Sequence, residues 1–229
     1  PTAAFSATNA CAGSPIAINN ASNGNGGTIY SNYWTFQNNG SSSATNPSPV
    51  FNTDGSYQLT LVTTTTDGCR DTAIGSVEIH PLPVAAFGVN DGCLNTLTSF
   101  NDASSISSGN IVNWNWNMGN NSTSSNQSPS LTYSTPGSYN VSLTVVSDNG
   151  CSDNATGMVN IFPVPDAQFT SGNVCFGSPA TFLNQSSVAG GENLTSSWSF
   201  SGGNTSTLSN PSVIFPSAGL QQATLQVTT

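Results

Sequence analysis

The sequence contains almost no positive charge and little charge of either sign. Among its 229 residues Arg70 is the one Lys or Arg, against ten Asp and Glu, and charged residues make up 5% of the chain. With a net charge of −9 the chain has no basic patch for a phosphate backbone, which excludes nucleic acid as a partner. An anionic membrane surface is excluded as a direct partner for the same reason. Because lysine is absent, Lys–Asn isopeptide cross-links cannot form, and stability must come from packing and disulfides.

Long apolar runs and helical periodicity are also missing. No stretch is long enough to insert into a membrane, and this segment shows no initiator Met or signal peptide. Hydrophobic residues make up 35% of the chain, below the usual share, while Asn, Ser and Thr together supply about 40%. Aromatic and β-branched residues still recur at spaced positions, so we expect a folded chain with a neutral surface rich in hydroxyls and amides.

What is present is a repeat with a fixed period of 82 residues. Proline, cysteine, tryptophan and glycine recur in register in three units; the landmarks are Pro1, Pro83, Pro165, Cys11, Cys93, Cys175, Trp34, Trp116, Trp198, Gly55, Gly137 and Gly219. The period predicts three domains, residues 1–82, 83–164 and 165–229, the third truncated before its last strand. Such arrays usually serve as spacers, scaffolds or multivalent binders, and much less often as catalysts.

Within a unit the apolar pattern has a period of two. In Ile111–Met118, Val112 and the tryptophans alternate with asparagines, which predicts a half-buried strand. Further short strands at Val84–Val89, Thr96–Asp102, Ser130–Tyr133 and Gly157–Phe162 predict an all-β, immunoglobulin-like sandwich. The linkers Pro81–Pro83 and Pro163–Pro165 each place two prolines in three residues, so we expect stiff connections and a rod-like array.

The cysteines predict disulfides and an oxidising compartment. Cys11 and Cys69 are 58 residues apart, as are Cys93 and Cys151, which favours one bridge inside each unit, worth roughly 4 kcal/mol. Buried free thiols and metal ligands are the alternatives. The partner of Cys175 would fall at position 233, past the end of this sequence. Disulfides place the chain outside the cell or on its surface.

Two aromatic positions are predicted to build the core. Trp34, Trp116 and Trp198 occupy the place of the buried tryptophan of an immunoglobulin-like sandwich, with sugar stacking as the alternative. Tyr57 and Tyr139 follow their glycines by two residues and are expected to form tyrosine corners. Unit 3 has Gln221 at the equivalent position, and glutamine is not expected to form such a corner. We therefore expect unit 3 to be the least stable.

These motifs resemble the polycystic kidney disease (PKD) domain family, an immunoglobulin-like sandwich. The matching residues are the opening Pro83, Ala85 and Phe87, the Trp-x-Phe of Trp34 and Phe36, the Asn-Pro-Ser of residues 46–48 and 210–212, the Gly-Ser-Tyr of 55–57 and 137–139, and the Gly-Cys-x-Asp of 68–71 and 150–153. The family often reads Trp-Asp-Phe-Gly-Asp-Gly, and those acidic residues are replaced here, so the resemblance does not carry over the calcium binding known at that loop. Two cysteines per unit and a Ser/Thr/Asn-rich surface resemble the secreted repeat proteins of Bacteroidota, including gliding-motility adhesins exported by type IX secretion.

The remaining candidate sites are sparse, and the sequence predicts no catalytic residue and no cofactor. Asp71 and Asp153 lie at equivalent places near a unit end and are weak calcium candidates; the alternative is a turn aspartate that caps backbone N–H groups. Thr72, within Asp-Thr-Ala, resembles a short O-glycan acceptor pattern of Bacteroidota. The only histidine, His80, precedes a linker proline and has no catalytic partner.

Three function hypotheses remain open. The first is a non-catalytic segment of a secreted surface fibre or adhesin, a stiff stalk or filament in adhesion or motility whose partners are neighbouring repeats and, by lateral packing, other copies. The second is a set of modules that bind polysaccharide or protein. The third is a spacer of a secreted hydrolase. The fixed period, and the lack of a repeated exposed aromatic pair, favour the first.

Overall fold

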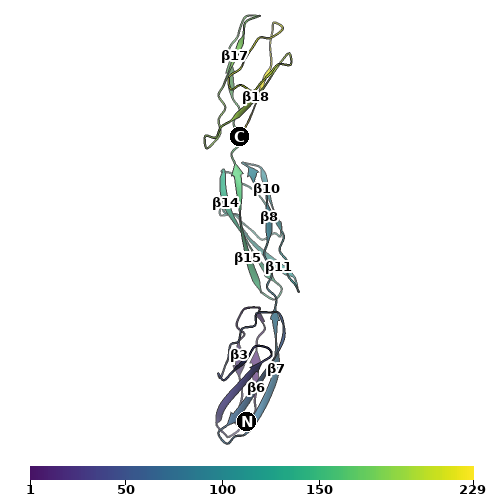
Figure 1. Ribbon diagram of the computed structural model, residues 1–229, viewed down its shortest axis with the longest axis vertical. Helices are drawn as coiled ribbons and strands as arrows, with labels where there is room; N and C mark the ends of the chain where they lie inside the picture. Colours follow the sequence, from purple (N-terminus) through teal and green to yellow (C-terminus); the bar gives the residue numbers. More distant parts are fainter. The chain divides into compact units, whose positions relative to one another are not determined.

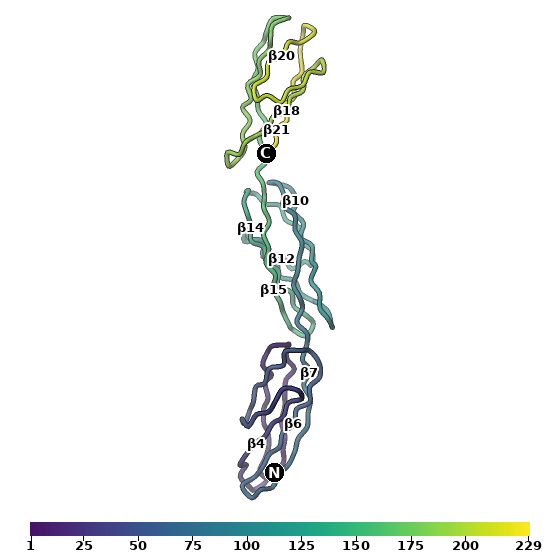
Figure 2. The backbone as a smooth tube through the Cα atoms, viewed as in Figure 1, coloured from purple at the N-terminus to yellow at the C-terminus, as the bar shows by residue number.

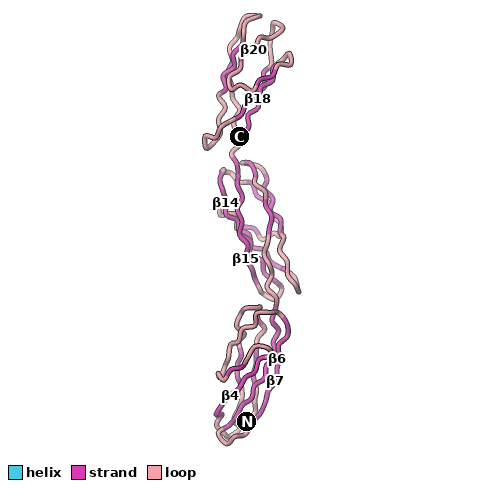
Figure 3. The backbone as a smooth tube through the Cα atoms, viewed as in Figure 1, coloured by secondary structure: helices cyan, strands magenta, loops and turns pink.

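The computed structural model describes residues 1–229 and consists of strands and loops without a helix (Figure 3). Accordingly, no helix in it is long and apolar enough to cross a membrane. Each hydrogen-bonded sheet takes its strands from one 82-residue repeat. The colours of Figure 2 follow the same division, since each repeat occupies one range of the bar.

The first repeat contains a two-stranded sheet and a five-stranded sheet. The small sheet pairs β1 (Phe5–Ala7) with β3 (Ile18–Asn20). The large sheet has the order β2-β7-β6-β4-β5. Its strands are β2 (Ala10–Cys11), β7 (Arg70–His80), β6 (Gly55–Thr65), β4 (Ile29–Phe36) and β5 (Ser41–Ser42). The long antiparallel pair β6 and β7 runs along one side of this repeat (Figure 1).

The second repeat has the same arrangement, with one more strand in the small sheet. That sheet has the order β13-β10-β8, from Ser130–Thr132, Leu97–Asp102 and Phe87–Val89. The large sheet has the order β12-β11-β14-β15-β9. Its strands are Thr123–Ser124, Ile111–Asn117, Gly137–Ser147, Ser152–Phe162 and Gly92–Cys93. Thus β15 begins five residues before the predicted Gly157, because the hairpin turn follows β14 directly.

The third repeat has two three-stranded sheets. One has the order β16-β17-β20, from Phe169–Ser171, Ala180–Asn184 and Ser212–Val213. The other has the order β19-β18-β21, from Thr205–Ser206, Thr195–Phe200 and Ala223–Thr228. In the first two repeats the strand equivalent to β21 pairs with β7 or β15, so β21 is an edge strand here.

A glycine in an unusual backbone conformation recurs once in each repeat, and in the first two repeats it is the first residue of β6 or β14. Gly55, Gly137 and Gly219 have φ angles of +136°, +146° and +111°, a conformation that residues with a Cβ rarely adopt. After these glycines, β6 and β14 alternate strictly between buried and partly exposed positions from Leu59 and from Val141 onward. Glycine therefore recurs every 82 residues at this position because the backbone there has a positive φ angle.

The predicted alternation fails at one end of the central strand. The register of β11 against β14 shifts between Ile111 and Asn113, and Val112 is 47% exposed, although the pattern places it with Trp116 on the buried face. β4 shifts in the same way beside Tyr30, which is 77% exposed. A bulge inserts one residue and reverses the faces beyond it, and the period-two pattern cannot show this.

The three tryptophans lie at the centres of the three sandwiches. Trp34, Trp116 and Trp198 are at most 2% exposed, and each indole N–H donates to a backbone carbonyl ten residues later at 3.0 Å. The opening phenylalanine of each repeat packs edge-on against its tryptophan, with ring centroids 5.1, 5.2 and 5.1 Å apart. Buried in this way, the indoles are not available to stack on a sugar.

Candidate functional site

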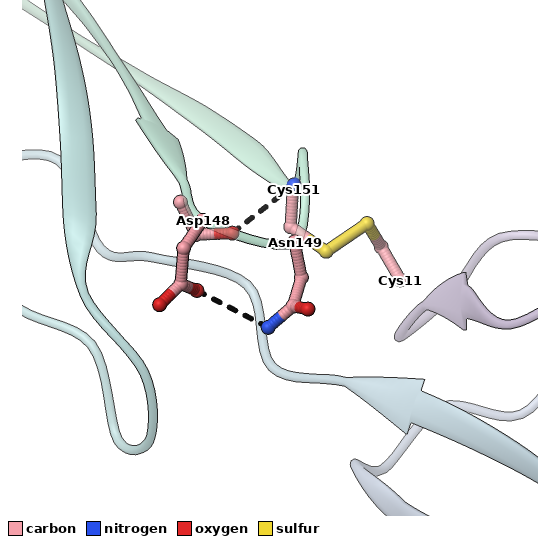
Figure 4. Close-up of a disulfide and its surroundings, with 5 residues drawn as sticks. Cys11, Asp148, Asn149 and Cys151 are labelled. Carbon is pink, nitrogen blue, oxygen red and sulfur yellow. Dashed lines mark hydrogen bonds between the residues drawn. A yellow bond between two sulfur atoms is a disulfide. The ribbon is translucent and has the colours of Figure 1, made fainter.

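The most distinctive site is a disulfide that joins two repeats. Cys11 of the first repeat is bonded to Cys151 of the second, a sequence separation of 140 residues (Figure 4). Cys69, Cys93 and Cys175 are free and exposed. The prediction of bonds within repeats, Cys11–Cys69 and Cys93–Cys151, is therefore wrong.

Strand length gives the physical reason. Cys69 immediately precedes β7, while Cys11 pairs in register with His80 at the other end of that strand. Eleven residues of strand span about 35 Å, whereas bonded cysteines need Cα atoms within about 7 Å. Equal spacing in the sequence showed that the cysteines are equivalent from unit to unit, and gave no information on which ends of the sandwich they occupy.

The bonded cysteines are held by different local structures. In β2, Cys11 belongs to a two-residue strand, and the next residue, Ala12, donates its N–H to the His80 carbonyl at 2.9 Å. Cys151 follows the Asp148–Asn149 turn between β14 and β15, and its N–H donates to Ser147 Oγ at 3.1 Å. Cys151 is 1% exposed. The bond therefore links a strand beside one linker to a hairpin turn of the following repeat.

The two calcium candidates accept backbone N–H groups. Asp71 Oδ2 accepts from Ala3 N, and Asp153 Oδ2 accepts from Ala85 N, both at 2.8 Å. The backbone N–H groups of Ala3 and then Thr72 hold the pKa of Asp71 below its usual value. This stabilising contribution is complete above the carboxyl's unfolded pKa and is lost as the pH falls through the lower folded value. No group of three or more His, Cys, Asp or Glu side chains is placed to hold a metal. Both aspartates tie the start of a repeat to its last long strand.

The two tyrosines form corners. Tyr57 donates its hydroxyl to the Thr53 carbonyl at 3.0 Å, and Tyr139 donates to Thr135 at 2.7 Å. Each ring also packs at a tilt against an aromatic neighbour, Phe51 or Tyr133, with centroids 4.3 Å apart. The repeated carbonyl four residues upstream fixes the loop that leads into β6 or β14.

Tyr133 gives the second repeat a specific response to alkali. Burial raises the pKa of Tyr133 to about 12, and neighbouring Tyr139 adds to the shift. An unfolded tyrosine ionises near pH ~10, so its stabilising contribution is complete below that pH and is lost as the pH approaches 12. We expect the second repeat to lose stability in this window, measured by urea unfolding at stepped pH. Tyr133→Phe, which introduces the residue found at positions 51 and 215, should remove this dependence; an unchanged slope would contradict the assignment.

Gln221 keeps the hydrogen bond of the missing tyrosine. Its Nε2 donates to the Ser217 carbonyl, four residues upstream, at 2.9 Å. The expectation that glutamine could not tie this loop was wrong, because the carbonyl needs a donor and an amide supplies one. What glutamine does not supply is an aromatic ring against Phe215. A cavity of about 160 Å³ lies there, lined by Phe215, Gln221 and Cys175 among others.

Filling this cavity should stabilise the third repeat. Gln221→Tyr restores the ring pair of the other repeats, and such pairs contribute about 0.5–1.5 kcal/mol beyond buried area. We expect the third repeat to gain roughly that much in chemical denaturation. The reciprocal Tyr139→Gln should cost the second repeat a similar amount or more. No gain from Gln221→Tyr together with no loss from Tyr139→Gln would show that the ring pair is unimportant at this corner.

A cluster specific to the second repeat was not predicted. Trp114 Nε1 donates to Asp102 Oδ2 at 2.7 Å, and Gln127 Nε2 donates to the same oxygen at 3.1 Å. Burial raises the pKa of Asp102, but hydrogen bonds from Ser104, Gln127 and Trp114 outweigh it, and the net pKa lies below the usual value. Two features of the sequence could have indicated this cluster. The positions equivalent to Asp102 in the other repeats are Asn20 and Asn184, and Trp114 has no aromatic residue at its equivalent positions.

The remaining candidates lie on β7. Thr72 is an exposed residue, and its O-glycosylation stays a prediction. His80 is partly buried at the end of the strand, as the register partner of Cys11. The structure thus gathers the histidine and one cysteine of the bond at the same end of the repeat.

Comparison with known proteins identifies the repeats. The family model of the PKD domain matches residues 1–79 and 80–163. Pre-pro-metalloprotease PrtV of Vibrio cholerae is 31% identical over 147 residues, which is 63% of this chain. The chain spans 16% of the length of that relative.

Two solved structures resemble single repeats. The PKD1 domain of V. cholerae metalloprotease PrtV is 38% identical, with 35% of this chain and 96% of that chain covered and a TM-score of 0.33. The PKD1 domain of Vibrio anguillarum Epp is 34% identical, with 35% and 93% covered and a TM-score of 0.33. Because the family model covers well over half of the sequence, this chain belongs to the PKD domain family.

Proposed function

We propose that the chain is a non-catalytic, load-bearing segment of an extracellular protein, working as a stalk or filament in adhesion or motility. The observation that carries this proposal is the Cys11–Cys151 bond. It adds a second covalent connection between the first two repeats, which are otherwise joined through the linker Pro81–Pro83 alone. Such a bond forms in an oxidising compartment, which supports an extracellular location.

The bond changes the path that force takes through the chain. Tension applied between the two ends enters at Pro1, reaches Cys11, and then passes through the sulfur atoms to Cys151. The backbone between the two cysteines, a separation of 140 residues, is bypassed. At ~3.3–3.6 Å per extended residue, about 460–500 Å of contour cannot be released. A stalk that must keep its length under load needs this property, and a passive linker does not.

Single-molecule stretching tests this role. The oxidised chain should release about 460–500 Å less contour than the same chain after reduction. Cys151→Ser should behave like the reduced protein, while Cys69→Ser, its equivalent without a bond, should behave like the oxidised one. If the oxidised and reduced chains extend equally, the bond does not carry the load and the proposal fails.

A second candidate is a spacer next to a hydrolase. The 31% identity to pre-pro-metalloprotease PrtV supports it, since that protein is named as a protease and its PKD1 domain resembles one repeat here. The same covalent connection would then keep the enzyme at a fixed distance from its support. A protease or other hydrolase domain in the remainder of the open reading frame would favour this candidate over a surface fibre.

The finer form of the first proposal is an adhesin of the gliding-motility type exported by type IX secretion. Its support is the Ser/Thr/Asn-rich composition and the Gly-Cys-x-Asp step at 68–71 and 150–153; the relatives described above are Vibrio proteins. Neutral faces also permit close lateral packing of copies, because little charge repels them. Binding of polysaccharide or protein is less well supported, since the repeated tryptophans are buried.

A further inference from the structure

The bond joins positions that are not equivalent within a repeat. Cys11 is the first cysteine of its repeat, and Cys151 is the second cysteine of the next one. The period of 82 gives each half of this bond an unbonded counterpart. Cys93 and Cys175 correspond to Cys11, and Cys69 corresponds to Cys151.

The counterparts of Cys11 have the same backbone setting. Cys93 lies in a two-residue strand, β9, and pairs in parallel with Phe162 at the end of β15, as Cys11 pairs with His80 at the end of β7. The carbonyls of Cys11, Cys93 and Cys175 each accept the N–H of the residue three positions later, at 3.0, 3.1 and 3.0 Å. The first half-site therefore has the same strand pairing in the first two repeats, and the third repeat keeps its turn hydrogen bond.

The counterpart of Cys151 is preformed as well. The carbonyl of Cys69 accepts from Thr65 N at 2.9 Å, and that of Cys151 accepts from Ser147 N at 2.8 Å. The preceding glycine closes the same turn in both, from Gly68 N to Thr65 O at 3.0 Å and from Gly150 N to Ser147 O at 2.9 Å. What differs is exposure: Cys69 is exposed, and bonded Cys151 is buried.

We propose that Cys69 and Cys93 are unfilled halves of the same inter-repeat disulfide, each to be bonded by an adjoining PKD repeat. Cys93 forms its bond with a cysteine 140 residues later in the chain, and Cys69 with a cysteine 140 residues earlier. This is the separation between Cys11 and Cys151. Cys175 is a third half-site of the Cys93 type. The sequence reaches the equivalent of Ser147 at Thr229, four positions short of the cysteine that Cys93 requires.

Bond formation is a thiol–disulfide exchange. The two thiols give up two electrons and two protons to a small-molecule disulfide such as oxidised glutathione, which leaves as two thiols. Each interior repeat then has one bond to the repeat before it and one to the repeat after it. This goes beyond the proposed function, because it concerns junctions other than the first and holds whether or not the array bears load.

The test completes the third repeat. Residues 148–164 are appended after Thr229, which places a cysteine at position 233, and the protein is refolded with reduced and oxidised glutathione. We expect peptide mapping to find Cys93 bonded to the added cysteine, next to the Cys11–Cys151 bond. In the matched chain with serine at position 233, Cys93 should be fully alkylated by iodoacetamide, and Cys175 should be alkylated in both chains. A bond between Cys175 and the added cysteine, or a Cys93 that stays reactive in the extended chain, would overturn the proposal.

A second variant tests the proposal independently, in case the extended chain does not fold. Residues 1–82 are duplicated in front of Pro1, which places the copy of Cys11 140 residues before Cys69. Cys69 should then be protected from alkylation and bonded to that copy. A reactive Cys69 in this chain would overturn the proposal, whereas equal extension of the oxidised and reduced 229-residue chain would overturn only the load-bearing role.

Discussion

Replacing Trp116 with alanine should cost the second repeat about 3–5 kcal/mol of unfolding free energy. The indole is 2% exposed, donates to the Asn126 carbonyl at 3.0 Å, and packs against the rings of Phe87 and Phe100. A domain of this size is stable by about 5–15 kcal/mol, so this loss removes much of the margin. Calorimetry should show the transition of the second repeat moving to a much lower temperature.

Trp114→Ala is the matched control, two residues away on the same strand. Trp114 is only partly buried and its one described hydrogen bond goes to Asp102, so we expect a loss of about 1–2 kcal/mol. The third repeat has its own tryptophan core and should be unaffected by either change. Equal losses from the two substitutions would contradict the assignment of Trp116 to the core and Trp114 to its edge.

Replacing Cys151 with serine should lower the combined unfolding free energy of the first two repeats by up to about 5 kcal/mol. The bond closes a loop of 140 residues, and the chain-entropy model assigns that amount to a loop of this length. Because the loop includes parts of both repeats, we also expect them to unfold less cooperatively once it is open. Denaturant unfolding of the oxidised variant and parent provides the measurement.

Cys69→Ser separates this account from bonds within repeats. Cys69 is free and exposed, so its replacement should change stability by no more than about 0.5 kcal/mol. A bond from Cys11 to Cys69 would instead make this variant as damaging as Cys151→Ser, at roughly 4 kcal/mol. Similar losses from both serine variants would therefore contradict the bond between repeats.

The sheets could largely be predicted from the sequence, because their cause is local. Alternating side chains in β14 place Val141, Leu143 and Val145 on one buried face, and a glycine with positive φ opens the strand. The bulge beside Val112 could not be predicted, since it depends on register against β14. Neither the composition nor the period-two pattern of the sequence indicates where the bulge lies.

The site was harder to predict than the fold, because its residues meet through tertiary structure. The spacing of the cysteines fits bonds 58 or 140 residues apart equally well, and only the length of β7 decides between them. Trp114 and Asp102 come from different strands, so neither residue alone indicates their hydrogen bond. At Gln221 the error was chemical: the corner requires a hydrogen-bond donor to a carbonyl, and tyrosine is one of several side chains that provide it.

The pairing of Cys11 with Cys151 is the central claim, and a single tryptic cut tests it. Arg70 is the only Lys or Arg, and it lies after Cys69 and between the two bonded cysteines. The oxidised chain is denatured, its free thiols are alkylated, trypsin is added, and the product is run on a gel without reductant. We predict that fragments 1–70 and 71–229 stay joined until a reductant is added. If they separate without reductant, no disulfide joins the first repeat to the second and the account is wrong.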